Sequence, residues 1–214
     1  MVSPTVIGAR PDYWAQASGH LASADAAMAG IVRAVGDAGH LSSRGDPFNT
    51  LARSIIGQQI SVKAAQSVWL RFEKAAGKVT PERVSRMRLT TLTRAGLSGR
   101  KAEYVRDLAG HFLSGSVDPS RWPESDDESV IAELVQVRGI GRWTAEMFLI
   151  FNLLRPDVFP LDDLGLLKAI ALHYNEGTPV TRAMAADIGE RWRPWRTVAT
   201  WYLWRSLDPL PVEY

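Results

Sequence analysis

The amino-acid sequence predicts an all-α fold, an orthogonal helical bundle in which two helical halves flank a cleft. Apolar residues recur at helical spacing along most of the chain, and no stretch has the convincing alternation of a strand. The connections between the helical stretches are short, which is typical of helices that pack on one another. With 214 residues, 46% of them hydrophobic, the chain can bury a substantial core.

The N-terminal part is expected to be an irregular arm followed by one helix. Residues 1–20 show little periodicity, so we expect an arm that packs Tyr13 and Trp14 on the body. Residues 23–35 place their apolar side chains on one helical face and end near two glycines.

Two helices with strong start signals follow. Asp46 before Pro47 is a typical helix start, and Ser61 is the expected cap of the next helix, with Val62 on its inner face. The break between these helices places Gln58 and Gln59 at a corner. These amides are either solvated loop groups or groups that enter a nucleic-acid groove or fill a gap in a base stack.

The middle of the chain predicts three further helices. Helices are expected from Thr80-Pro81, over residues 90–95, and from Ser98 to about residue 113. Arg100 and Lys101 lie in the first turn of the last of these, where cations oppose the helix dipole. A bound phosphate would relieve this conflict, and ordinary solvated charges are the alternative.

A glycine hairpin is the central motif of the sequence. After the loop 115–126, a helix capped by Asp126 ends at Val137, and a second helix follows Gly139-Ile140-Gly141 and runs to about residue 154. The N-terminus of that second helix is a candidate phosphate site. An ordinary turn between two core helices is the other interpretation of so short a motif.

Two adjacent carboxylates precede the next helix. Asp162 and Asp163 exceed what one cap needs, so one can cap the helix while the other stabilises a developing cation or orients a water. Leu164 is expected to face inward from this helix. Further helices are expected after Thr178 or Thr181 and from Arg193 onward.

Composition excludes several kinds of site. The chain has no cysteine, so disulfides, cysteine zinc sites and iron–sulfur clusters are excluded. Its four scattered histidines lack metal-ligand spacing, and neither a side-chain metal site nor a cofactor is expected. The net charge of +2 is compatible with nucleic-acid binding but does not require it. The chain shows no membrane span and no signal sequence, so we expect a soluble intracellular protein.

Four ordered blocks resemble the helix-hairpin-helix DNA glycosylases, and above all their alkylated-base branch, the 3-methyladenine DNA glycosylase II type. The resemblance covers roughly residues 45–205. Its blocks are Asp46-Pro-Phe with Ile56-Gly-Gln-Gln-Ile-Ser61, Ser98-Gly-Arg-Lys-Ala102, the stretch from Leu134 through the hairpin to Asp163, and Arg191-Trp-Arg-Pro-Trp-Arg196.

The resemblance implies a role for each matched position. Asp163 would be the catalytic carboxylate, and Asp162 a cap or supporting carboxylate. Gln59 falls where family members insert a wedge into the gap left by a flipped base, and Trp143 and Trp195 would line the base pocket. The residues expected to contact DNA are Gln58, Arg100, Lys101, Gly139, Ile140, Gly141, Arg142 and Thr144. No side-chain metal site is implied, although the hairpin of this family can hold a monovalent cation on main-chain carbonyls, here those of Val135, Val137 and Ile140.

Position 143 separates two kinds of family member. Members that cleave the DNA strand carry a lysine there as a Schiff-base nucleophile, and this chain carries tryptophan. The resemblance therefore implies a monofunctional glycosylase that excises alkylated purines of the 3-methyladenine and 7-methylguanine type. A non-catalytic protein that binds lesions or DNA structures, and a bifunctional glycosylase/lyase for oxidised bases, are the alternatives.

The expected organisation and partner follow from the same resemblance. We expect residues 1–40 to pack with the C-terminal helices, residues 41–160 to form a helical core with the helix-hairpin-helix at about 127–153, and residues 161–214 to carry the aspartate helix and the C-terminal helices. The expected partner is double-stranded DNA with damaged bases, bound by a monomer at the nucleoid in the cytoplasm or in a nucleus.

Overall fold

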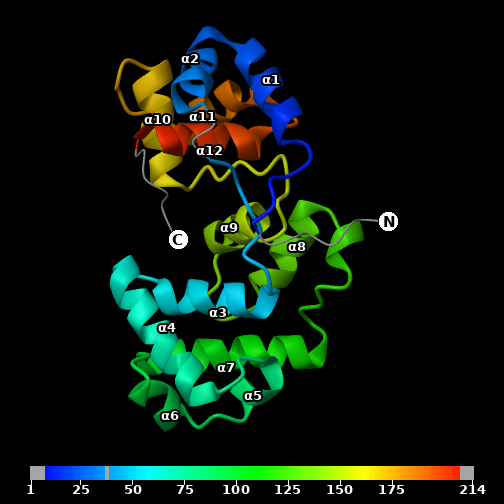
Figure 1. Ribbon diagram of the computed structural model, residues 1–214, viewed down its shortest axis with the longest axis vertical. Helices are drawn as coiled ribbons and strands as arrows, with labels where there is room; N and C mark the ends of the chain where they lie inside the picture. Colours follow the sequence, from blue (N-terminus) through cyan, green and yellow to red (C-terminus); the bar gives the residue numbers. More distant parts are fainter. Residues whose placement is uncertain (1–7, 37–38, 208–214) are drawn as a thin grey trace. The chain divides into compact units, whose positions relative to one another are not determined.

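The computed structural model describes residues 8–36 and 39–207, and these form an all-helical protein (Figure 1). No strand occurs in these two ranges, so the all-α fold class is confirmed. None of the helices there is both long and apolar enough to cross a membrane.

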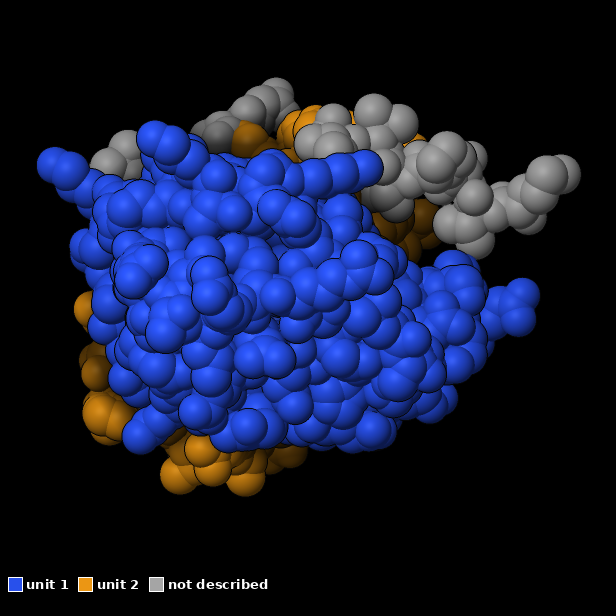
Figure 2. Space-filling view, turned by 90° about the horizontal axis from the view of Figure 1, so that it is seen from below, with its two compact units in different colours: residues 1–5, 44–148, 213–214 blue, residues 6–43, 149–212 orange. Residues whose placement is uncertain are grey.

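The chain divides into two compact units, which Figure 2 shows in different colours. Among the described residues, unit 1 holds 44–148, and unit 2 holds 8–43, apart from 37–38, together with 149–207. Both ends of the described chain therefore belong to unit 2. One helix, α9 (Arg142–Phe151), contributes its first residues to unit 1 and its last residues to unit 2.

Most α-helices of unit 1 begin at polar residues that cap them. Besides the start of α9, its helices are α3 (Pro47–Gly57), α4 (Val62–Ala76), α5 (Pro81–Ser85), α6 (Leu89–Arg94), α7 (Gly99–Ser114), the 3-10 turn η1 (Trp122–Glu124) and α8 (Asp127–Leu134). Four of the predicted caps are confirmed, because each accepts a hydrogen bond from the main-chain N–H three residues further on: Asp46, Ser61, Ser98 and Asp126.

Helix α7 lies along α3 at the centre of unit 1 and also contacts α5 and α6 (Figure 1). Phe48 of α3 meets Phe112 of α7 edge to face, with ring centroids 5.3 Å apart. The inward placement of Val62 is wrong, because this side chain is 53% exposed at the first turn of α4. Helix α8 ends at Leu134 rather than at Val137, so the hairpin connection is longer than predicted.

Unit 2 packs around α12 (Arg196–Leu207), which contacts α1 (Trp14–Ala24), α2 (Ala26–Val35) and α10 (Leu164–Tyr174). The remaining elements are α11 (Arg182–Gly189), capped by Thr181, and the 3-10 turn η2 (Glu190–Trp192). Nearly every residue of the middle of α12 is buried, which identifies it as the core helix of this unit.

The prediction of an irregular arm is wrong for residues 14–20, which belong to α1. This helix buries only Trp14, Ala17 and Leu21, contains Gly19, and has no side-chain cap. These features weaken the periodicity and the start signal that a sequence can show. Residues 1–7 of the predicted arm lie outside the described range.

Asp25 joins three elements of unit 2. Its carboxylate caps α2 through the N–H of Met28 at 2.7 Å and accepts hydrogen bonds from the Tyr174 hydroxyl at 3.0 Å and from Trp192 Nε1 at 3.4 Å. A partly buried acceptor shared in this way fixes α2 relative to α10 and η2.

Candidate active site

The hairpin between α8 and α9 requires glycine at position 139. Gly139 has a φ of +88°, and a Cβ built there would lie 2.2 Å from Cδ2 of Tyr104. Ile140 is buried and donates its N–H to the carbonyl of Val137 at 3.1 Å. The N–H of Ala145 bonds to the carbonyl of Gly141 at 3.0 Å, which starts α9. The predicted Gly-x-Gly turn is therefore a tight connection seated on an aromatic ring.

Side chains of helix α7 bind the residue that leads into this hairpin. The main-chain N–H of Arg138 donates to Oδ2 of Asp107 at 2.9 Å, and its guanidinium pairs with Glu103 at 3.0 Å. The same guanidinium lies 5.6 Å from the ring centroid of Tyr104. Three side chains of one helix thus contact Arg138, the residue directly before Gly139.

The turn after α3 is tied to the hairpin and to α7. Gln58 donates its Nε2 to the carbonyl of Gly139 at 2.8 Å, so its amide is already used within unit 1. The ammonium of Lys101 donates to the carbonyls of Ile56 at 2.7 Å and Gln58 at 2.6 Å. Partial burial lowers the pKa of Lys101. Gln59, the next residue, is exposed and has a φ of +59°, in the left-handed region.

The remaining predicted phosphate contacts have different surroundings. Arg100 is exposed at the start of α7. Arg142 is paired with both carboxylate oxygens of Glu128 and with Oε1 of Glu146 at 3.1 Å, and the hydrogen bond to Glu128 raises the pKa of Arg142. Thr144 is buried. Of these three side chains, Arg142 is therefore already used in ion pairs of unit 1, and Thr144 is part of its interior.

Asp163 is fixed at the start of α10 in unit 2. The residue is 5% exposed, and its Oδ1 accepts hydrogen bonds from the N–H of Leu166 at 2.6 Å and from Nε1 of Trp204 at 2.8 Å. The indole of Trp204 stacks on Phe151, with centroids 5.8 Å apart and planes 10° apart. A Cβ at Gly165 would lie 3.1 Å from the same oxygen, so glycine there leaves room for the carboxylate.

The cap role expected for Asp162 is wrong, because Asp163 is the residue that caps α10. Asp162 is half-exposed and forms an ion pair with Arg182 at the start of α11. The inward placement of Leu164 is also wrong, since its side chain is 81% exposed beside Asp163. Once Asp163 turns inward to cap the helix and meet Trp204, the next residue points outward.

The two predicted pocket tryptophans belong to different units. Trp143 lies in the first turn of α9 in unit 1, and Trp195 lies just before α12 in unit 2. Both are half-buried. Trp195 stacks on Tyr13, with centroids 5.5 Å apart and planes 22° apart, and the Tyr13 hydroxyl donates to the carbonyl of Leu154 at 2.7 Å. Tyr13 therefore packs on the body as predicted.

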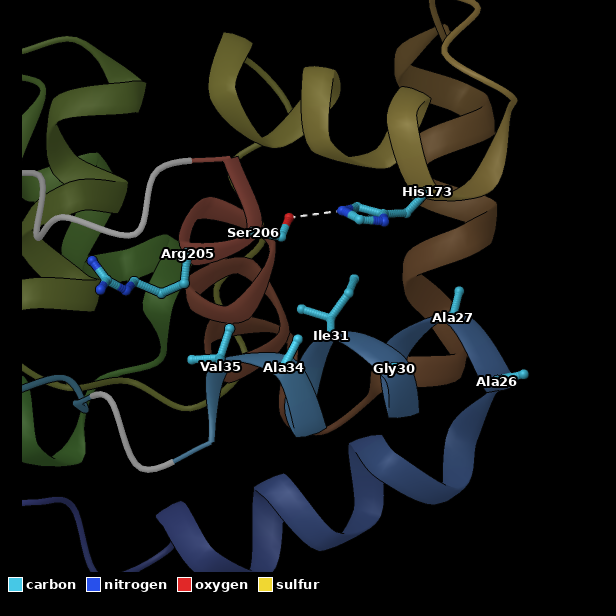
Figure 3. A pocket seen from close by; sticks show the side chains of 9 residues that line it. All are labelled: Ala26, Ala27, Gly30, Ile31, Ala34, Val35, His173, Arg205 and Ser206. Atoms are coloured by element: carbon cyan, nitrogen blue, oxygen red, sulfur yellow. Dashed lines mark hydrogen bonds between the residues drawn. The ribbon is translucent and has the colours of Figure 1, made fainter.

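A separate cavity of about 570 Å³ lies within unit 2 (Figure 3). Apolar residues of α2 line it together with His173 of α10 and with Arg205 and Ser206 of α12. His173 Nε2 and the Ser206 hydroxyl are 2.8 Å apart, as the dashed line in Figure 3 shows. None of the predicted site residues lines this cavity.

Within the described residues, no group of three or more His, Asp or Glu side chains could hold a metal ion. Of the carbonyls considered for a monovalent cation, that of Val137 accepts the N–H of Ile140.

Sequence reasoning missed Trp204 and the structural role of Lys101. The helical pattern of α12 shows many apolar residues but does not indicate which one reaches Asp163, 41 residues earlier in the chain. Lys101 has the same sequence signal as its exposed neighbour Arg100, and only the tertiary fold distinguishes the two.

Comparisons with known proteins identify the family of this chain. A family model described as "HhH-GPD superfamily base excision DNA repair protein" matches residues 52–194. The chain is 32% identical to DNA-3-methyladenine glycosylase 1 of Schizosaccharomyces pombe over 193 residues, which cover 87% of this chain and 85% of that protein. It is also 32% identical to a putative DNA-3-methyladenine glycosylase of Bacillus subtilis over 169 residues, but there it spans only 59% of the relative's length.

Solved structures give the same result. The S. pombe 3-methyladenine DNA glycosylase in complex with abasic DNA has a TM-score of 0.79 and 30% identity, covering 92% of this chain and 100% of that one. The DNA-3-methyladenine glycosidase of Bacillus halodurans has a TM-score of 0.76 and 33% identity, covering 86% and 90%. The chain belongs to the HhH-GPD superfamily of base excision DNA repair proteins, in the branch of the 3-methyladenine DNA glycosylases.

Proposed function

We propose that this protein is a monofunctional DNA glycosylase that excises alkylated purines and leaves an abasic site. The substrates are bases of the 3-methyladenine and 7-methylguanine type, and the reaction hydrolyses the N-glycosidic bond. The observation that carries the proposal is Asp163, a carboxylate held by two hydrogen bonds at the head of α10 in a chain of this family.

Hydrolysis of this glycosidic bond requires little more than a carboxylate held in a fixed position. Alkylation at a ring nitrogen makes the base cationic and a good leaving group, so a strong general acid is unnecessary. The sugar then develops oxocarbenium character, which the Asp163 carboxylate stabilises while it guides water to the anomeric carbon. The cap bond and the Trp204 bond fix one carboxylate oxygen, so the group is oriented before the reaction begins.

The base is recognised after it leaves the stack, at a cost of about a few kcal/mol that is smaller for a damaged base. We assign Gln59, exposed in unit 1, to the gap that the base leaves, and Trp143 and Trp195 to the base itself. An indole face attracts a cationic purine by about 0.5–2 kcal/mol. Asp162, paired with Arg182, acts as a supporting carboxylate.

We assign the grip on DNA to the main chain of Gly139, Ile140 and Gly141, with Arg100 as a side-chain contact. Phosphate contacts of this kind position the protein and do not select a sequence. Gln58, Lys101 and Arg142 have partners within unit 1 and Thr144 is buried, so their contribution to binding is indirect. The protein acts as a monomer on damaged double-stranded DNA, at the nucleoid or in the nucleus.

Asp163→Asn tests the catalytic assignment without removing the cap. Asparagine is as good an N-cap as aspartate, and its amide oxygen can still accept from Leu166 and Trp204. We expect the variant to lose about 10²- to 10³-fold in release of 7-methylguanine from methylated DNA, as removal of a charge-stabilising group does elsewhere. Binding to abasic DNA should persist, and Asp162→Asn should lose far less. Equal loss in the two variants would refute the assignment of Asp163.

Two other activities make different predictions in the same assay. A non-catalytic lesion-binding protein would bind methylated DNA without releasing any base. A bifunctional glycosylase/lyase would be trapped on DNA by borohydride through a Schiff base, which needs an amine at the site. Because position 143 is tryptophan, we expect base release without a trapped adduct.

A further inference from the structure

One side of α7 supports both elements that we assign to DNA contact in unit 1. Lys101, Tyr104 and Asp107 are spaced three residues apart along α7, so their side chains leave adjacent positions of the same face. Lys101 reaches the turn after α3, Tyr104 underlies Gly139, and Asp107 binds the N–H of Arg138. This face therefore sets the position of the turn and of the hairpin together.

The turn that Lys101 holds contains a strained residue. Gln59 is not glycine, yet its φ is +59°, a conformation that ordinary residues adopt rarely and at a cost. Its own side chain is exposed, so packing of that side chain does not explain the conformation. The surrounding contacts must hold the backbone in place.

Those contacts act on the peptide bond that precedes Gln59. The carbonyl of Gln58 and the N–H of Gln59 belong to one planar peptide group, so a bond to that carbonyl fixes the plane on which the φ of Gln59 turns. The Lys101 ammonium lies 2.6 Å from this carbonyl oxygen and 2.7 Å from that of Ile56. On the other side, the Gln58 amide donates to Gly139 at 2.8 Å.

We propose that Lys101 is a positioning residue, which holds the Gln58 carbonyl so that the left-handed backbone presents Gln59 to the DNA, while the Gln58 amide keeps this turn in register with the hairpin. The inference rests on the proposed function, in which Gln59 fills the gap left by the flipped base. Lys101 then acts through Gln59, and not through a phosphate.

The two roles predict different behaviour. A lysine that contacts phosphate contributes to binding of any DNA, and its loss lowers the salt dependence of binding by about one counterion. A lysine that acts through Gln59 raises the rate of excision by positioning the side chain that fills the gap. When the Gln59 side chain is removed, substitution of this lysine should not lower the rate further. Non-additivity of two substitutions is the signature of such coupling.

The decisive experiment is a double-mutant cycle on single-turnover excision of 7-methylguanine from a defined duplex. The proteins are the wild type, Lys101→Met, Gln59→Ala and the double variant. We expect each single substitution to lower the rate about tenfold and the double variant to lie within about twofold of Gln59→Ala. Arg100→Met removes the same charge from the exposed neighbouring residue, and we expect its effect to multiply with that of Gln59→Ala.

Multiplicative effects of Lys101→Met and Gln59→Ala, or a fall in salt dependence for Lys101→Met equal to that for Arg100→Met, would overturn the inference. So would a Gln59→Ala variant with wild-type excision. If the wild type releases no base at all, the proposed function fails first, and this outcome is distinct from the others.

A second readout separates positioning from folding. 2-Aminopurine opposite an abasic-site analogue reports gap filling by its fluorescence, without any excision. We expect Lys101→Met and Gln59→Ala to reduce the fluorescence change seen with the wild type by the same fraction. Thermal unfolding, measured in parallel, shows whether each variant is folded. If Lys101→Met does not fold, Gln58→Met takes its place in the cycle, since it removes only the amide donor to Gly139. Additivity of that substitution with Gln59→Ala would equally reject the coupling.

Discussion

At the scale of single residues, the structure requires glycine at only one of the two glycine positions of the hairpin. Gly139 has a positive φ and no room for a Cβ, whereas no atom lies within 4 Å of a Cβ at Gly141. We expect Gly139→Ala to destabilise the protein by more than about 1 kcal/mol, through both strain and contact with Tyr104. Gly141→Ala should stay within about 0.5 kcal/mol of the wild type in urea unfolding. Similar stability of the two variants would show that the hairpin backbone can rearrange.

Trp204 acts on Asp163 through a single atom, its indole nitrogen. Its Nε1 donates to Asp163, and its ring stacks on Phe151. Trp204→Phe keeps a ring and removes the donor, so we expect excision to fall about tenfold with little change in KM, as loss of one hydrogen bond to a charged group implies. Trp201→Phe in the same helix is the control, since its ring contacts Trp14, Tyr202 and Arg205. An equal loss of excision in both variants would indicate a packing effect.

At the scale of elements, four helix starts of unit 1 were predictable because each uses local chemistry. Asp46, Ser61, Ser98 and Asp126 cap helices through hydrogen bonds that span three residues, and such bonds leave a mark in the sequence. Helix α1 begins without such a cap, so its start left no signal. The ends of α8 and α9 were less predictable: they stop at Leu134 and Phe151, about three residues before the predicted ends, and no glycine or proline follows directly.

We expect the contact between α10 and α12 to depend on pH through His173. This side chain lies beside Ser206, and burial lowers its pKa below the ordinary value of 6.5. The folded protein therefore favours the neutral imidazole, while the unfolded chain still takes up a proton near that value. The stability that this preference contributes is complete above about pH 6.5 and decreases as the pH falls toward the folded pKa.

We therefore expect the wild type to lose stability relative to His173→Gln between pH 7 and 5, as measured by urea unfolding at several pH values. His20→Gln is the matched control, because His20 is exposed. It should follow the wild type across the whole range. A His173→Gln curve parallel to that of the wild type would mean that protonation of His173 is not linked to folding.

At the scale of the whole molecule, the sequence could predict local structure more readily than long-range contacts. The Gly139-Ile140-Gly141 turn and the aspartates before α10 could be found in the sequence, because each rests on a short stretch of chain. Lys101 and Arg142 were expected at phosphates, yet the fold directs them to main-chain carbonyls and to Glu128. A basic side chain near a DNA-binding motif shows its charge in the sequence, but its partner is set by residues far along the chain.

The distribution of charge leads to a last prediction. The net charge is only +2, yet residues 71–106 carry ten Lys or Arg against three Asp or Glu. Arg86 and Arg88 are exposed in this stretch, whereas Arg121 is paired with Asp118 and Glu133. Because DNA affinity depends on counterions released by cations that neutralise phosphates, we expect Arg86→Gln with Arg88→Gln to flatten the plot of log affinity against log salt by up to about 2. The Arg121→Gln slope should match the wild type, since its carboxylate partners already neutralise it. An unchanged slope in the double variant would place the basic stretch outside the DNA-binding surface.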